Sequence, residues 1–187
     1  GTYELIKEMT RLRTACYIVI DMFSGIRDSE MMSLTEGCIT EGPSSDGGVA
    51  LMWLHGTIYK TGVRAKRWLV PSIVAHAVRI LTQVTASVRR DLEDEEKILT
   101  AKLASSGAIQ RAELIKRLDT VHNAKHRLFV AKQRGVTNVL CGTRMNKLLK
   151  EFCEHCGVNG SDGRPYSLYA HQFRRTYAHF VARSELG

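Results

Sequence analysis

Residues 23–30 read Phe-Ser-Gly-Ile-Arg-Asp-Ser-Glu, and this short stretch separates two segments of helical pattern. Before it, apolar residues recur at steps of three and four over residues 5–22, which predicts a helix that the Ser-Gly pair ends. After it, Asp28 or Ser29 can cap a second, short helix. Arg27 is therefore expected in the turn between two helices.

Outward from this stretch, the chain continues a mainly helical pattern around a short hairpin. Apolar runs at residues 49–55 and 66–70 flank a turn-like Lys-Thr-Gly, which predicts two antiparallel strands. Helical spacing predicts further helices at about residues 71–84, 91–128 with a break at 105–107, 143–152 and 169–184, with a short extended piece at 127–132. The last helix places four residues on a face that can bury: Phe173, Tyr177, Phe180 and Val181. We therefore expect a mainly α fold with a small antiparallel β-sheet, of the α+β class.

The composition indicates one basic, globular domain. The 187 residues suit a single domain, and hydrophobic residues at 44% and charged residues at 25% are close to the averages of folded proteins. Lys and Arg number 27 against 19 Asp and Glu, and residues 47–90 carry 7 basic side chains and no acidic one. Such a field attracts polyanions, nucleic acid first, unless these side chains are only solvated helix faces.

Apolar runs and cysteines argue against a membrane protein and a disulfide-rich secreted one. The longest apolar stretch, residues 15–23, is interrupted by Asp21 and is too short to span a membrane. Five cysteines, an odd number at irregular spacing, predict free thiols in the cytoplasm. The first residue, Gly1, begins no secretory leader and suggests an excised fragment.

Three separated motifs stand out: residues 23–30, Tyr-Lys-Thr-Gly at 59–62, and Ala-His-Gln-Phe-Arg-Arg-Thr-Tyr-Ala at 170–178. Their order and spacing resemble the catalytic domain of the tyrosine recombinases, the phage integrase family. That family carries G-[IL]-R-x-x-E after an apolar helix, a lysine on a basic hairpin, and H-x-L-R-H-[ST]-x-A on a late helix. Each motif alone is weakly specific, but together they extend across nearly the whole chain.

The chemistry of DNA strand transfer explains these residue types. Attack on a phosphodiester spreads negative charge over the non-bridging oxygens, and planar guanidinium groups form paired hydrogen bonds with them. Arg27 and Arg174 suit this role, and His171 lies on the same helical face as Arg174. The resemblance implies that Lys60 protonates the departing 5′ oxygen and that His171 donates or shuttles a proton. The alternatives are an ordinary exposed lysine and a surface histidine.

Four further cations and one carboxylate complete the expected site. Glu30 supports the Arg27 turn by a hydrogen bond or ion pair, or is only a first-turn helix charge. Arg64, Lys66, Arg67 and Arg175 are expected to contact double-stranded DNA, and Arg175 replaces a histidine that is frequent in the family. We expect neither a metal ion nor a cofactor.

The sequence also departs from the family. The family's nucleophilic tyrosine follows the second arginine motif at some distance, whereas this sequence stops at Gly187. We therefore expect residues 1–187 to be a catalytic-domain fragment that binds DNA without cleaving it, lacking the nucleophile and an N-terminal core-binding domain. The resemblance implies an integrase of a phage or other mobile element, in the bacterial cytoplasm and associated with the nucleoid. It also implies a tetramer on DNA for the full-length protein, and we expect the fragment to be a monomer.

Three other interpretations remain open at this point. The Cys-Glu-His-Cys run at 153–156 has zinc-like spacing, but Cys141 and His122 or His126 would have to complete the site. A non-enzymatic helical DNA-binding regulator would insert the last helix into the major groove. A type IB topoisomerase shares the strand-transfer chemistry. The charged segment 91–123 has no motif that explains it.

Overall fold

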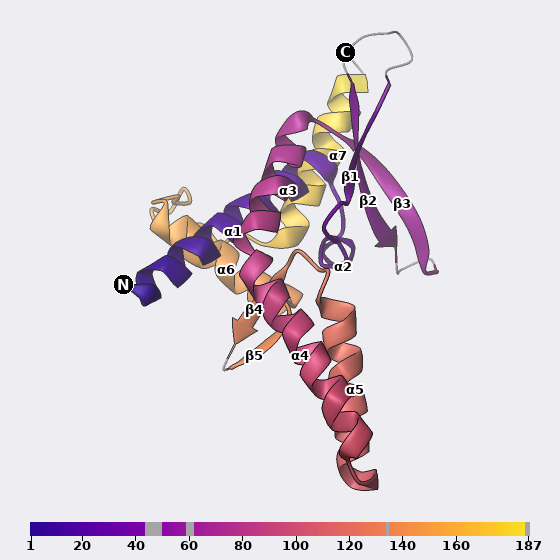
Figure 1. Ribbon diagram of the computed structural model, residues 1–187. Helices are drawn as coiled ribbons and strands as arrows, with labels where there is room; N and C mark the ends of the chain where they lie inside the picture. The colour runs from indigo at the N-terminus through magenta and orange to yellow at the C-terminus, as the bar shows by residue number, and fades with distance from the viewer. Residues whose placement is uncertain (44–49, 59–61, 134, 186–187) are drawn as a thin grey trace.

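The computed structural model describes residues 1–43, 50–58, 62–133 and 135–185. The fold is mainly α with small antiparallel sheets, as the sequence predicts (Figure 1). In chain order the elements are α1 (Thr2–Ser24), α2 (Asp28–Met31), β1 (Ile39–Gly42), β2 (Leu51–Ile58), β3 (Arg64–Val70), α3 (Ser72–Val84), α4 (Ala86–Ser105), α5 (Ala108–Ala124), β4 (Val130–Gln133), β5 (Val136–Val139), α6 (Gly142–His155) and α7 (Ala170–Glu185).

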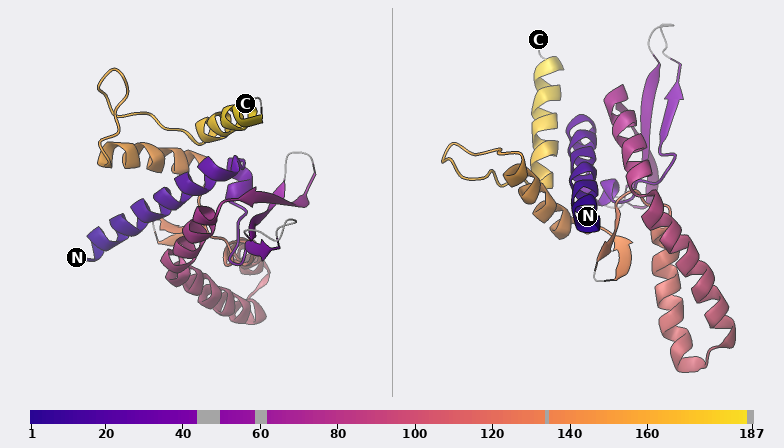
Figure 2. Two further views of the ribbon diagram at one scale, coloured as in Figure 1. Left: turned by 90° about the horizontal axis from the view of Figure 1, so that it is seen from above. Right: turned by 60° about the vertical axis from the view of Figure 1, so that its left-hand side comes forward.

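Helix α1 is the centre of the main body. It packs against α3, α6 and α7 (Figure 2). Tyr17 and Ile20 on this helix are fully buried, and the Tyr17 ring meets the ring of Phe129 edge-on at 5.5 Å between centroids. The N-terminal turns of α1 extend away from the body, and Leu5 there is 61% exposed. One end of the longest helix is therefore held by the core and the other is solvated.

The predicted hairpin is present as β2 and β3, and it belongs to a three-stranded antiparallel sheet in the order β1-β2-β3. Strands β1 and β5 were not predicted, whereas the extended piece expected at 127–132 overlaps β4, which pairs with β5 in a second sheet. Side chains alternate between the two faces of a strand. Leu54 and Ile58 of β2 are buried on the face toward the core, whereas His55 lies on the opposite face and accompanies Arg67 in the register.

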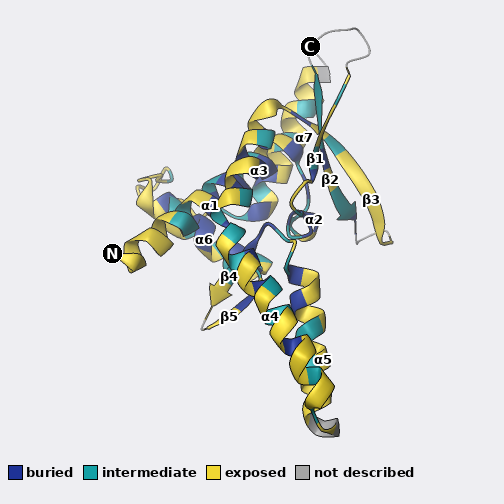
Figure 3. Ribbon diagram, viewed as in Figure 1, coloured by how far each residue is buried: buried dark blue, intermediate teal, exposed yellow. Residues whose placement is uncertain are grey.

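The charged segment after α3 forms a helical hairpin that projects from the body (Figure 1). Its helices, α4 and α5, are separated at Ser106-Gly107, within the predicted break. A small core of its own holds the hairpin at its base, formed by Leu92, Leu99, Val121, Ala124 and Val130. Beyond that core the hairpin surface is mostly exposed (Figure 3).

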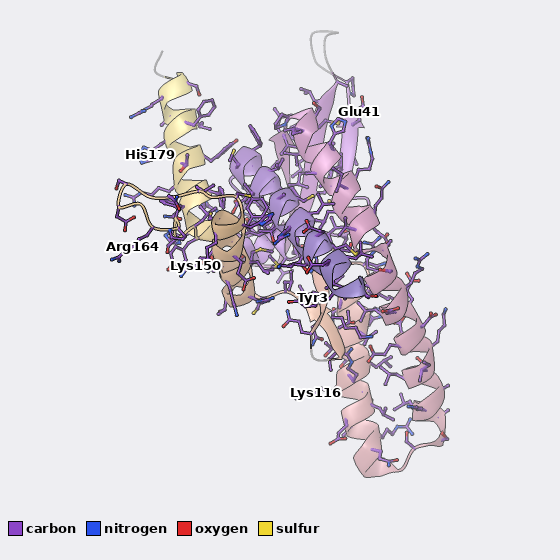
Figure 4. The ribbon with its side chains drawn as sticks, turned by 90° about the vertical axis from the view of Figure 1, so that its left-hand side faces the viewer. Tyr3, Glu41, Lys116, Lys150, Arg164 and His179 are labelled. Carbon is purple, nitrogen blue, oxygen red and sulfur yellow. The ribbon has the colours of Figure 1, made fainter. Side chains whose placement is uncertain are left out.

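Helices α6 and α7 are joined by the loop at residues 156–169. Figure 4 shows Lys150 on α6, Arg164 in this loop and His179 on α7 on one side of the molecule, and Lys116 far from them on the helical hairpin. Phe173 on α7 is buried at 8% exposure, as its spacing predicts. Phe180 is 70% exposed, so the expectation that it enters the core is wrong: Tyr177 and Val181 are half-buried on the side of α7 toward the body, and Phe180 lies on the solvent-exposed side of the helix. Within the described residues, none of the helices has the length and apolar character that a membrane span requires.

Candidate functional site

The turn that carries Arg27 is built by a glycine. Gly25 ends α1 in the left-handed conformation, with φ 57° and ψ 25°, and its N–H donates to the carbonyl of Asp21 at 2.9 Å. Glycine adopts this conformation without the steric cost of a Cβ. The chain then becomes extended at Arg27, with φ −77° and ψ 151°, before α2 begins. The reversal presents Arg27 at the end of α1.

Glu30 holds Arg27 through two contacts. The Glu30 Oε2 atom accepts a hydrogen bond from the Arg27 backbone N–H at 3.0 Å, and Oε1 accepts one from the Arg27 Nη1 at 2.9 Å. Glu30 is buried, whereas the Arg27 side chain is 35% exposed. A buried carboxylate therefore fixes one edge of the guanidinium and leaves the rest accessible. The N-cap of α2 is Arg27 itself, so the expectation of a cap at Asp28 or Ser29 is wrong.

Helix α7 brings Arg174 to the same place. Its first turn is fixed because Gln172 Oε1 accepts the Tyr169 N–H at 2.7 Å and Asn146 Oδ1 of α6 accepts the Ala170 N–H at 3.0 Å. One turn beyond Arg174, the Tyr177 ring lies against Gly25. A Cβ at that glycine would stand 2.5 Å from Tyr177 Cδ1.

Arg27 and Arg174 line one open cavity of about 470 Å³, together with Lys66 of β3. The carboxylate at this cavity is Glu30, which is already bonded to Arg27. Three cations against one internally paired carboxylate give the cavity a net positive charge. Ala178 also lines it, and its small side chain leaves room for a ligand. The chemistry of such a cavity suits an anion with several oxygens, such as a phosphodiester.

The structure does not place every expected residue at this cavity. His171 is exposed on α7, beside the ring of Tyr169 at 5.9 Å between centroids, and is absent from the cavity lining. Arg175 is exposed on α7 and is likewise absent from the lining. Lys60 lies outside the described residues, so its position relative to the cavity stays a prediction.

The hairpin cations separate onto two faces of β3. Lys66 faces the cavity, and by alternation the exposed Arg64 lies on the same side of the strand. Arg67 lies on the opposite face, where its guanidinium sits 4.3 Å above the ring of Trp53. Along the sequence these three residues were expected to form one DNA-binding set, although the period of a strand already separates their side chains.

Two neighbouring carboxylates near Arg174, the buried Asp21 and the half-buried Asp28, were not expected at the site. Asp21 of α1 is 1% exposed, and burial, reinforced by the nearby Asp28 charge, raises its pKa from 3.8 to about 8. The Tyr17 hydroxyl and the Arg174 charge oppose this rise. Tyr17 donates its hydroxyl to Asp28 Oδ1 at 3.0 Å. Asp21 was visible in the sequence as the one acidic residue inside an apolar run.

The described residues contain no group of three or more His, Cys, Asp or Glu side chains placed to hold a metal ion. Cys153 is buried and Cys156 is exposed, and neither forms a disulfide in the structure. The cavity between Arg27 and Arg174 is thus built from cations, a carboxylate and aromatic rings.

Comparison with known proteins gives a limited likeness. No protein-family model matches the chain, and no curated protein matches it. Among solved structures, it is similar to the XerH site-specific recombinase bound to palindromic difH substrate in a post-cleavage complex, with 15% identity and a TM-score of 0.48. It is similar to XerH bound to difH in a pre-cleavage complex, with 14% identity and a TM-score of 0.48. Each alignment covers 96% of this chain but only 37% and 38% of the respective recombinase chains.

Proposed function

We propose that residues 1–187 are part of the catalytic domain of a tyrosine recombinase, which cleaves and rejoins double-stranded DNA through a 3′-phosphotyrosine intermediate. The observation that carries the proposal is the meeting of Arg27 and Arg174 at one cavity, although they lie near opposite ends of the sequence. Each arginine lies in a sequence motif that resembles a motif of this family.

Arg27 and Arg174 act on the phosphate. In the reaction a tyrosine oxygen attacks phosphorus, the bond from phosphorus to the 5′ oxygen breaks, and a proton is delivered to that oxygen. The two guanidinium groups donate hydrogen bonds to the non-bridging oxygens, where negative charge grows. Because Glu30 holds Arg27 in place before DNA arrives, little reorganisation is required at this side of the phosphate.

Two further roles come from the resemblance. Lys60 is proposed as the acid that gives its proton to the departing 5′ oxygen, and His171 as a donor to the phosphate from the same helix as Arg174. His171 would need to turn from the Tyr169 ring toward the bound DNA. Arg64, Lys66, Arg67 and Arg175 are proposed to contact the DNA.

The nucleophile is proposed to come from outside residues 1–187. Tyr177 lines the cavity, but its ring packs against Gly25 and is required there to hold α7 on the turn. The same proposal includes a mobile-element integrase, a bacterial cytoplasmic location and a tetramer on DNA for the full-length protein, with residues 1–187 monomeric.

The deciding experiment uses the full reading frame that contains this sequence and nicked duplexes taken from the DNA that flanks its gene. A protein-DNA adduct that survives denaturant, and that disappears in Arg27→Ala and Arg174→Ala, would establish the phosphotyrosine reaction. Lys97→Ala is the matched control, because Lys97 is an exposed cation on the projecting hairpin. Losing either arginine should lower the cleavage rate by about 100-fold or more.

Other outcomes assign other functions. Tight DNA binding without an adduct, unaffected by Arg27→Ala, would indicate a helical DNA-binding regulator. Relaxation of a supercoiled plasmid without site preference would indicate a type IB topoisomerase. Either result would overturn the recombinase assignment.

A further inference from the structure

Lys66 has a defined partner in the cavity. Its ammonium lies 5.1 Å from the centroid of the Trp68 ring, and both side chains line the cavity with Arg27 and Arg174. The two residues are separated by one position on β3, so they lie on the same face of the strand. Among the described residues no carboxylate forms an ion pair with Lys66, and Glu30, the carboxylate at this cavity, is bonded to Arg27. The ammonium is therefore held by an aromatic face and keeps its charge available for an anion.

The neighbouring strand makes room for this pair. Gly56 of β2 is the register partner of Lys66, and a Cβ there would stand 3.1 Å from Cζ3 of the Trp68 indole and 3.3 Å from Cδ2 of Leu34. The indole therefore lies closely over the glycine, and the Lys66 ammonium lies over the indole. A larger residue at position 56 would displace the ring from beneath the ammonium.

We propose that Lys66 is a third cation that contacts the phosphate held by Arg27 and Arg174, and that Trp68 is the residue that positions it. The inference rests on the proposed function and adds to it one phosphate contact and its support. A lysine side chain is flexible, and a cation-aromatic contact narrows its range before the ligand binds. The lysine then approaches the phosphate from the sheet, while the two arginines approach from α7 and from the α1–α2 turn.

The first test measures DNA binding by residues 1–187 against salt concentration, using a duplex of about 20 base pairs. One lost phosphate contact should lower the slope of log affinity against log salt by about 0.9, which corresponds to about eight-fold weaker binding at 0.1 M salt. Lys66→Met should show this loss and Lys66→Arg should restore the slope. Lys97→Met, which removes an exposed cation on the hairpin, should leave the slope unchanged.

The second test uses Trp68 as a probe, because the chain contains only two tryptophans. In a Trp53→Phe protein the fluorescence comes from Trp68 alone. Addition of the duplex should change its emission as Lys66 moves to the phosphate, and Lys66→Met should abolish that change. Trp68→Ala should weaken binding with Lys66 intact, and Trp68→Phe should recover most of the affinity because the ring remains.

The possible failures can be told apart. In one outcome Arg174→Ala lowers the salt slope of DNA binding, but Lys66→Met leaves that slope unchanged, as Lys97→Met does. The inference about Lys66 is then wrong and the proposed function stands. If the wild-type chain does not bind DNA, or Arg174→Ala changes nothing, both are wrong.

Discussion

Substitution of Gly25 by alanine should destabilise the protein and loosen the joint between the two arginine-bearing segments. Gly25 has φ 57°, and the Tyr177 ring covers the position that a Cβ would take, with Cδ1, Cγ and Cε1 at 2.5, 3.0 and 3.2 Å. Alanine in the left-handed conformation costs about 1–2 kcal/mol. The ring must also move, and forcing extra atoms into a packed contact costs about 1–3 kcal/mol.

The sum is a loss of about 2–5 kcal/mol in the free energy of unfolding. For a chain of this length each kcal/mol lowers the midpoint of thermal unfolding by about 2–4 °C, so we expect a fall of roughly 4–20 °C. Urea titration followed by circular dichroism, with a parallel thermal scan, measures both quantities. Binding of duplex DNA should weaken in the same variant because Tyr177 is one turn from Arg174.

Gly37→Ala is the matched control. Gly37 also has a left-handed φ, 75°, but a Cβ there would meet nothing within 4 Å, so alanine should cost only the backbone strain. The double substitution Gly25→Ala with Tyr177→Ala removes the collision and should destabilise by less than the sum of the single changes. If Gly25→Ala and Gly37→Ala lower the free energy of unfolding equally, the close packing of Tyr177 on Gly25 does not contribute as described.

Three further predictions follow from buried groups. Burial raises the pKa of Asp21 from 3.8 to about 8. Between pH 3.8 and pH 8 the folded state therefore binds one proton more than the unfolded state. The free energy of unfolding should fall by about 1.4 kcal/mol for each pH unit as the pH rises across this range. Asp21→Asn should remove this slope in urea titrations from pH 5 to 8, and a slope that persists in the variant would contradict the assignment. Arg89→Met should lower the free energy of unfolding, measured by urea titration, by about 2–4 kcal/mol, because the buried guanidinium bonds the Thr82 carbonyl, the Thr85 hydroxyl and Glu36. A loss below about 0.5 kcal/mol, which is typical of an exposed ion pair, would contradict this prediction. A thiol reagent at pH 8 should label the exposed Cys141 and Cys156 first, while the three buried cysteines should react only on unfolding; equal rates for all five would show that the core opens readily.

Local pattern was sufficient for most of the helices. The apolar spacing predicts α1, and the Ser-Gly pair that follows marks its end because glycine tolerates the left-handed C-cap. The break between α4 and α5 is visible as Ser-Ser-Gly at 105–107, and there the backbone is extended at Ser106 and Gly107. Strand β1 has only four residues, and its pairing with β2 is a tertiary contact that its own sequence does not encode.

The site, like strand β1, depends on tertiary contacts that local sequence does not encode. Motifs pointed to Arg27, Glu30 and Arg174, but their meeting depends on the packing of α7 against the end of α1. The Glu30 contacts could be expected from the spacing of three residues at a helix start. The partnership of Lys66 with Trp68 depends on Gly56 in the adjacent strand, and without the strand register no pattern along the chain connects these residues.

The projecting hairpin is a separate module in the architecture. Helix α4 departs just after α3, and α5 returns to β4 beside the point of departure, so the excursion begins and ends at nearly the same place (Figure 1). Its base is fastened by Arg117, which bonds Glu95 through two atoms at 2.7 Å and the Thr137 carbonyl at 3.1 Å. The arm can therefore be lengthened or shortened at its tip by whole helical turns while the elements that carry the two arginines stay where they are.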